Sequence, residues 1–127
     1  METNQKKKIL LVEDDTALSE MYQHKFTLEG YEIMAAHSGG EGFQMALAHK
    51  PDLILLDILL PVMDGMTVMK KLRVDPWGKN VPIIMLTNLN PDDNILKGVV
   101  EEHPAYYLMK SNSEPSDVVE KVKEVLK

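Results

Sequence analysis

Short apolar runs alternate along the chain with segments in which apolar residues recur at helical spacing. Four of the runs are continuous, which is typical of strands covered on both faces, and a fifth segment alternates with period two. Strands are therefore predicted at residues 9–12, 31–36, 53–56, 82–86 and 105–109. The segments between and after them predict helices at 16–29, 38–49, 66–75, 90–100 and 113–126.

Residues with known positional preferences mark several of these boundaries. Gly30 ends the first helix, and Ser38 and Glu41 have the spacing of a capping box that opens the second. Asn90 followed by Pro91 and two acidic residues predicts the start of the fourth helix, with Asn90 as the N-cap and proline in the first position. These signals agree with the apolar pattern.

Five successive strand–helix units predict one α/β domain covering residues 1–127. Because continuous apolar strands need cover on both faces, the sheet is expected to be parallel and to lie between two helix layers. Right-handed crossovers then give a doubly wound sheet. In such sheets, functional sites form beyond the carboxyl ends of the strands, where the strand order reverses.

The composition of the chain excludes several classes of function. The net charge of −6 argues against direct nucleic-acid binding, and the run Lys6–Lys8 is interpreted as a solvated chain start. The chain has no cysteine, so disulfides, thiolate catalysis and cysteine-ligated zinc are excluded. No apolar run approaches the ~18 residues of a membrane span, and residues 1–8 do not resemble a secretory signal. A cytoplasmic protein that binds no membrane is expected.

Polar side chains stand at four of the five predicted strand ends. Glu13 and Asp14 follow the first strand, Asp57 the third, Thr87 the fourth and Lys110 the fifth. Three carboxylates in one small volume repel one another, at a cost of several kcal/mol for each close pair at an effective dielectric near ~20. Cations must compensate for this repulsion.

A divalent metal and Lys110 can supply that charge. Hard oxygen ligands favour Mg²⁺, with Mn²⁺ as a substitute, and we predict Asp14 and Asp57 as direct ligands and Glu13 as a ligand through water. Asp57 can attack phosphorus to form an aspartyl phosphate, while metal and lysine neutralise the phosphoryl oxygens. The Thr87 hydroxyl can donate a hydrogen bond to the attached group.

Each of these residues also has an ordinary structural interpretation. A strand-end aspartate is often a helix N-cap, which is an open alternative for Asp15, and a lone threonine or lysine there is usually structural. The order of acid, acid, hydroxyl and lysine on strands one, three, four and five makes the functional interpretation the better one.

Five motifs resemble those of the receiver domain of bacterial two-component response regulators. They are ILLVEDD at 9–15, PDLILLD at 51–57, LPVMDG at 60–65, PIIMLT at 82–87 and YLMK at 107–110. The resemblance implies a flavodoxin-like fold with strand order 2-1-3-4-5. It implies that Asp57 is phosphorylated, that the backbone carbonyl of Leu59 joins Asp14 and Asp57 on the metal, and that Thr87 and Tyr107 form a switch pair.

The resemblance also implies partners. Asp57 would receive its phosphoryl group from a sensor histidine kinase or a phosphotransfer protein, and the strand 4–helix 4–strand 5 face would contact a downstream protein that the sequence does not identify. The chain would be a switch and not an enzyme, and a monomer or a weak, phosphorylation-dependent dimer.

Three departures from the family pattern are informative. Ser111 replaces the proline that usually follows the lysine, which leaves the isomer of the Lys110–Ser111 peptide open. Asn88 replaces a small residue after the switch threonine, and His103-Pro104 replaces small and acidic residues before the last strand.

Other functions on this fold fit less well. A flavin module needs a loop after strand one that binds phosphate, which Glu13, Asp14 and Asp15 would repel. A haloacid-type phosphatase carries a second aspartate where this chain has Leu59. A phosphorylation-independent interaction domain is the remaining alternative.

Overall fold

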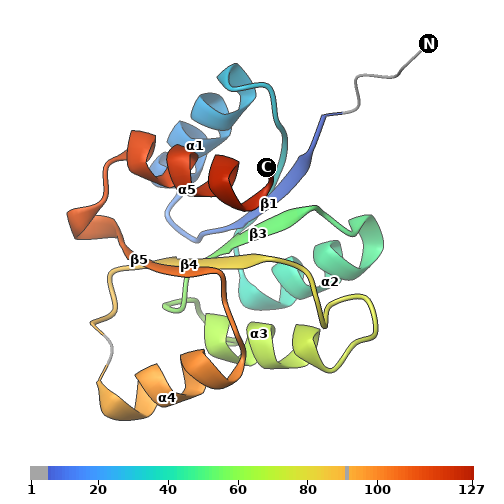
Figure 1. Cartoon of the computed structure of the whole chain (residues 1–127), viewed down its shortest axis with the longest axis vertical. Helices are drawn as coiled ribbons and strands as arrows, with labels where there is room; N and C mark the ends of the chain where they lie inside the picture. Colours follow the sequence, from blue (N-terminus) through green and yellow to red (C-terminus); the bar gives the residue numbers. More distant parts are fainter. Residues whose placement is uncertain (1–5, 91) are drawn as a thin grey trace.

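The computed structural model describes residues 6–90 and 92–127, which form a parallel sheet with helices on both faces (Figure 1). The strands are β1 (Lys8–Val12), β2 (Glu32–Ala36), β3 (Leu53–Leu56), β4 (Ile83–Thr87) and β5 (Tyr106–Met109). The helices are α1 (Thr16–Leu28), α2 (Gly39–His49), α3 (Gly65–Arg73), α4 (Asp93–Glu101) and α5 (Pro115–Val125), with a 3-10 turn at Lys110–Asn112.

The sheet has the order β2-β1-β3-β4-β5, and every neighbouring pair is parallel. This confirms the predicted doubly wound, flavodoxin-like architecture with strand order 2-1-3-4-5. β1 lies between β2 and β3, so after β2 the chain crosses to the other side of β1, where the strand order reverses. In register, Val12 lies opposite Leu56, and Thr87 lies opposite Met109. The residues that follow these pairs therefore emerge at the same edge of the sheet.

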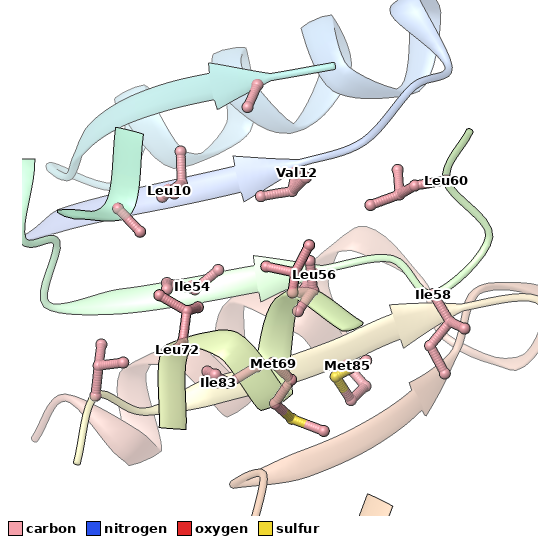
Figure 2. Packing of buried hydrophobic residues seen from close by; sticks show 14 residues of the cluster. Leu10, Val12, Ile54, Leu56, Ile58, Leu60, Met69, Leu72, Ile83 and Met85 are labelled. Atoms are coloured by element: carbon pink, nitrogen blue, oxygen red, sulfur yellow. The ribbon is translucent and has the colours of Figure 1, made fainter. Parts of the chain in front are cut away.

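Alternate strand residues face two separate hydrophobic clusters. Leu10, Val12 and Ile54 pack with α2 and α3 in one cluster, part of which is seen in Figure 2. Ile9 and Leu11 pack with α1 and α5 in the other. Figure 1 shows α1 and α5 on one side of the sheet and α2, α3 and α4 on the other. The central strands β1, β3 and β4 are buried on both faces, as their continuous apolar runs predict, whereas the edge strands β2 and β5 are only partly buried.

Side chains at the helix starts explain several boundaries. Asp15 is the N-cap of α1 and accepts a hydrogen bond from the Leu18 N–H, so its structural interpretation is correct. Ser38 caps α2 through the Glu41 N–H, but the Glu41 carboxylate accepts from the N–H of His37 rather than from that of Ser38. The second half of the predicted capping box is thus displaced by one residue.

The structure corrects one helix start and decides one point that the sequence left open. Helix α4 begins at Asp93, later than the predicted start at Asn90, and Pro91 of that start signal lies outside the described residues. The described residues contain no cis peptide bond, so the Lys110–Ser111 bond is trans. In the same part of the chain, no helix combines the length and apolar character needed to span a membrane.

Truncating a core strand residue tests the two-sided burial. Leu55→Ala is expected to lower the free energy of unfolding by about 2–5 kcal/mol, because Leu55 is fully buried and its loss leaves a cavity. Leu28→Ala, the same change at a side chain that is 71% exposed, should change it by less than about 0.5 kcal/mol. Urea unfolding measures both values, and equal effects would contradict the described core.

Candidate functional site

The carboxyl ends of β1, β3 and β5 bring Glu13, Asp57 and Lys110 together. The Lys110 Nζ lies 2.6 Å from Glu13 Oε1 and 2.6 Å from Asp57 Oδ2. Both carboxylates are almost fully buried, and the lysine side chain is 14% exposed. The three groups predicted from separate strand ends therefore form one ion-paired cluster.

Asp14 adds a third carboxylate to this cluster. One ligand oxygen from each of Glu13, Asp14 and Asp57 lies within 4.8 Å of the other two, with Asp14 on the solvent side. Three carboxylates beside one ammonium leave two negative charges uncompensated. The oxygen donors and this charge fit a hard divalent cation such as Mg²⁺.

Backbone hydrogen bonds hold the two buried carboxylates in fixed orientations. The Leu59 N–H donates to Asp57 Oδ1 at 3.0 Å, and the Asp15 N–H donates to Glu13 Oε2 at 3.0 Å. In each carboxylate, one oxygen thus meets Lys110 and the other meets a backbone N–H. The side chains are preorganised, because neither can rotate without losing two charge-assisted contacts.

Burial and neighbouring charges shift the pKa values of Glu13 and Lys110. Burial raises the pKa of Glu13, even though Lys110 and the Asp15 N–H favour its charged form. Burial would lower the pKa of Lys110, but its hydrogen bonds to Asp57 and Glu13 outweigh burial and raise it. Lys110 therefore stays protonated and keeps its positive charge inside the site.

Gly65 allows the Asp57 loop to pack against the start of α3. A Cβ at this position would lie 2.1 Å from the backbone oxygen of Asp57, closer than any contact allows. The Gly65 N–H also donates to the Ile58 carbonyl at 2.9 Å. Only glycine fits this close approach, which fixes the turn that follows Asp57.

Thr87 and Tyr107 are joined through one intervening residue. The Thr87 hydroxyl, which is fully buried, accepts from the Leu89 N–H at 3.2 Å. The Tyr107 hydroxyl donates to the Leu89 carbonyl at 2.6 Å. Burial raises the pKa of the Tyr107 phenol, and the Asp57 charge adds to this effect. Both hydroxyls of the predicted switch pair are thus bonded to the backbone of Leu89.

His37 was not among the residues predicted from sequence. It follows β2, the one strand end without a predicted role, and its Nδ1 lies 3.2 Å from the Glu13 carbonyl oxygen. With the proton on Nδ1, the ring donates to this carbonyl and braces the loop that carries Glu13 and Asp14. Its place at a strand end was a usable signal; its target, a backbone oxygen, was not visible in the pattern.

Comparison with known proteins finds one consistent group. The model of the response regulator receiver domain matches residues 9–123. The phosphate regulon regulatory protein PhoB of Pseudomonas aeruginosa is 35% identical over 121 residues, which cover 95% of this chain and 52% of PhoB. The chain spans between 20% and 52% of the length of the curated relatives it matches.

Solved structures of similar chains agree. A CheY-like receiver domain protein from Methanospirillum hungatei is 31% identical with a TM-score of 0.88, and the match covers 96% of this chain and 94% of that one. The chemotaxis protein CheY4 of Vibrio cholerae is 26% identical with a TM-score of 0.86, covering 95% and 99% respectively. These matches extend over almost the whole chain.

Removing the lysine tests the charge balance of the cluster. In metal-free buffer at neutral pH, Lys110→Met is expected to lower the free energy of unfolding by about 3–5 kcal/mol, because two buried carboxylates lose their cation. Adding Glu13→Gln should restore part of the loss. Lys123→Met, which breaks the exposed pair with Glu29, should cost much less, because water screens that pair. Equal losses in urea unfolding for the two lysine variants would contradict the description.

Proposed function

The chain belongs to the family of response regulator receiver domains, and we propose that it is a phosphoacceptor switch in which Asp57 receives a phosphoryl group. The donor is a phosphohistidine on a sensor histidine kinase or on a phosphotransfer protein. The observation that carries this proposal is the buried Asp57 carboxylate, held 2.6 Å from Lys110 inside an acidic cluster.

The transfer makes one bond and breaks one. A carboxylate oxygen of Asp57 attacks phosphorus as the bond between phosphorus and the donor imidazole nitrogen breaks. That nitrogen keeps the electron pair and takes up a proton, and the products are neutral histidine and an acyl phosphate on Asp57. Lys110, already beside Asp57, remains charged and neutralises negative charge on the phosphoryl oxygens. The protein undergoes a change of state and does not turn over a substrate.

The acidic cluster provides for a metal ion. We assign the direct ligands of Mg²⁺, or of Mn²⁺ in its place, to Asp14, Asp57 and the backbone carbonyl of Leu59, with Glu13 acting through water. When bound, the ion neutralises charge on the transferring phosphoryl group. The cluster of three carboxylates supports this assignment, because its net charge is unfavourable without a cation.

The contacts of Leu89 suggest how the state of Asp57 is relayed. If the Thr87 hydroxyl turns to donate to a phosphoryl group, its contact with the Leu89 N–H changes. Because the Leu89 carbonyl holds the Tyr107 hydroxyl, the ring of Tyr107 responds to this change. Tyr107 lies on β5, so the response reaches the surface formed by β4, α4 and β5. A downstream protein would read that surface.

The remaining assignments follow the family. We propose a cytoplasmic protein that is monomeric or forms a weak, phosphorylation-dependent dimer, and that contacts neither nucleic acid nor membrane directly through this domain. The net charge of −6 supports the absence of a nucleic-acid contact.

Phosphorylation of Asp57 is directly measurable. Incubation with acetyl phosphate and Mg²⁺ should add the mass of one phosphoryl group to the intact protein, and peptide mapping should place it on Asp57. Asp57→Asn should abolish the gain, and so should chelation of the metal. Asp52 lies at the opposite end of β3, where its carboxylate accepts a hydrogen bond from the Lys8 N–H. Asp52→Asn should therefore leave the gain in mass intact. A mass gain in Asp57→Asn would refute the assignment.

The residue after the switch threonine is expected to limit access to Asp57. Asn88 is exposed beside Thr87 and is larger than the residue usually found there. Asn88→Ala should therefore speed phosphorylation by acetyl phosphate, as followed by mass spectrometry over time. Asn90→Ala, the same change two residues further along at another exposed position, should leave the rate unchanged. An unaltered rate in Asn88→Ala would count against this role.

A further inference from the structure

Arg73, the last residue of α3, binds four backbone carbonyls at the end of the molecule opposite Asp57. Its Nε donates to Glu102 at 2.8 Å, and its Nη1 donates to Gly78 at 2.9 Å and to Val81 at 2.7 Å. Its Nη2 donates to His103 at 3.3 Å. A planar guanidinium with five N–H groups is the only side chain that can make all of these contacts together.

These carbonyls belong to two loops that Arg73 joins. Gly78 and Val81 lie between α3 and β4, and Glu102 and His103 lie between α4 and β5. A pocket of about 600 Å³, partly open to solvent, lies beside the guanidinium and is lined by residues of both loops. Arg73 donates to carbonyls of both loops, so its hydrogen bonds connect them.

The carbonyls of Glu102 and His103 form the C-terminal end of α4. The N–H groups of these two residues close the last turn on Val99 and Val100, and His103 has a left-handed φ of 53°. The last turn of α4 has no basic residue, and Glu101 and Glu102 place acids at the negative pole of the helix. Arg73 supplies from α3 the cation that this helix end lacks.

The positive charge of Arg73 faces the backbone carbonyls that it binds. No carboxylate within the described ranges forms an ion pair with it, and burial lowers the pKa of the guanidinium, which nevertheless stays protonated. Charge-assisted bonds to carbonyls are roughly twice as strong as neutral ones.

The described side chains of helix α4 provide few other anchors. Among its described side chains only Val99 is buried. Gly98 faces Met66 of α3 closely enough that a Cβ would lie 3.2 Å from the Met66 Cε. Just beyond the loop, the Ala105 N–H donates to the Ile83 carbonyl at 2.7 Å and starts the pairing of β5 with β4. The end of α4 that Arg73 holds is therefore also the entry to the strand that carries Tyr107.

We propose that Arg73 is a positioning residue of the switch. It fixes the C-terminal end of α4 and the entry to β5, so that the rest of the helix can respond to Tyr107 while this end stays in place. This role rests on the proposed function, because it concerns the surface that reports the state of Asp57. Arg73 touches none of the reacting groups.

Amide hydrogen exchange tests this role. In Arg73→Gln, exchange should accelerate by about tenfold or more in the last turn of α4 and at the amides of Glu102, His103 and Ala105, while α1 and α2 keep their wild-type rates. Beryllium fluoride with Mg²⁺, a stand-in for the phosphoryl group, should change the exchange of α4 in the wild type and change it less in Arg73→Gln. Arg73→Lys keeps the charge without the fork of donors, so it should fall between the two.

Lys70→Gln is the matched control, because it removes one positive charge from an exposed position on the same helix and should behave like the wild type. Wild-type exchange of α4 in Arg73→Gln would overturn the proposal. So would equal acceleration in α1 and α4, which would mean a general loss of stability. If Arg73→Gln does not fold, Arg73→Lys decides, since an unchanged α4 in that variant overturns the proposal as well.

The two proposals can fail separately. Hydrogen exchange without beryllium fluoride requires no chemistry at Asp57. If Arg73→Gln accelerates exchange in α4 but the protein is never phosphorylated, only the proposed function is refuted. Normal phosphorylation with no Arg73 effect on α4 would refute only the role of Arg73.

Discussion

The contact of Lys110 with both Glu13 and Asp57 is the interaction on which the site depends. Two almost fully buried carboxylates would repel each other strongly at this distance, and the ammonium 2.6 Å from each makes their proximity tolerable. The compensation is incomplete, because Asp14 adds a third negative charge. This residual charge fits the divalent cation and the phosphoryl chemistry that we propose for the site.

The parallel sheet produces this contact from residues that are far apart in the chain. The pairing of Val12 with Leu56 places Glu13 beside Asp57, and Lys110 follows β5 at the same edge. Gly65 then lets α3 approach the backbone of Asp57 and fixes the turn after it. The central strands β1, β3 and β4 are buried on both faces, so their register cannot shift without exposing apolar side chains. The rigid sheet thus sets the distances in the site.

Beside the packed clusters, two sets of polar contacts join neighbouring elements through backbone groups. Leu89 connects Thr87 with Tyr107, and Arg73 connects α3 with the end of α4. The single contacts at Leu89 can change partner with small rotations, whereas the four hydrogen bonds of Arg73 and the packed cores resist deformation. A contact at Leu89 that can change and a fixed end at Arg73 suit the proposed switch, in which the surface around α4 changes state while the acidic site remains fixed.

The sequence by itself determined the five strands and their helices, because apolar runs are local patterns. It also determined the grouping of Glu13, Asp14, Asp57 and Lys110, because these residues follow strands whose carboxyl ends meet at one edge of a parallel sheet. It left Asp15 ambiguous between cap and site, and the cap contact with Leu18 decided this. Only the tertiary structure revealed the roles of Leu89, His37 and Arg73. Each of these contacts joins a side chain to a backbone atom, and every residue possesses backbone atoms, so no sequence pattern identifies which one a distant side chain will meet.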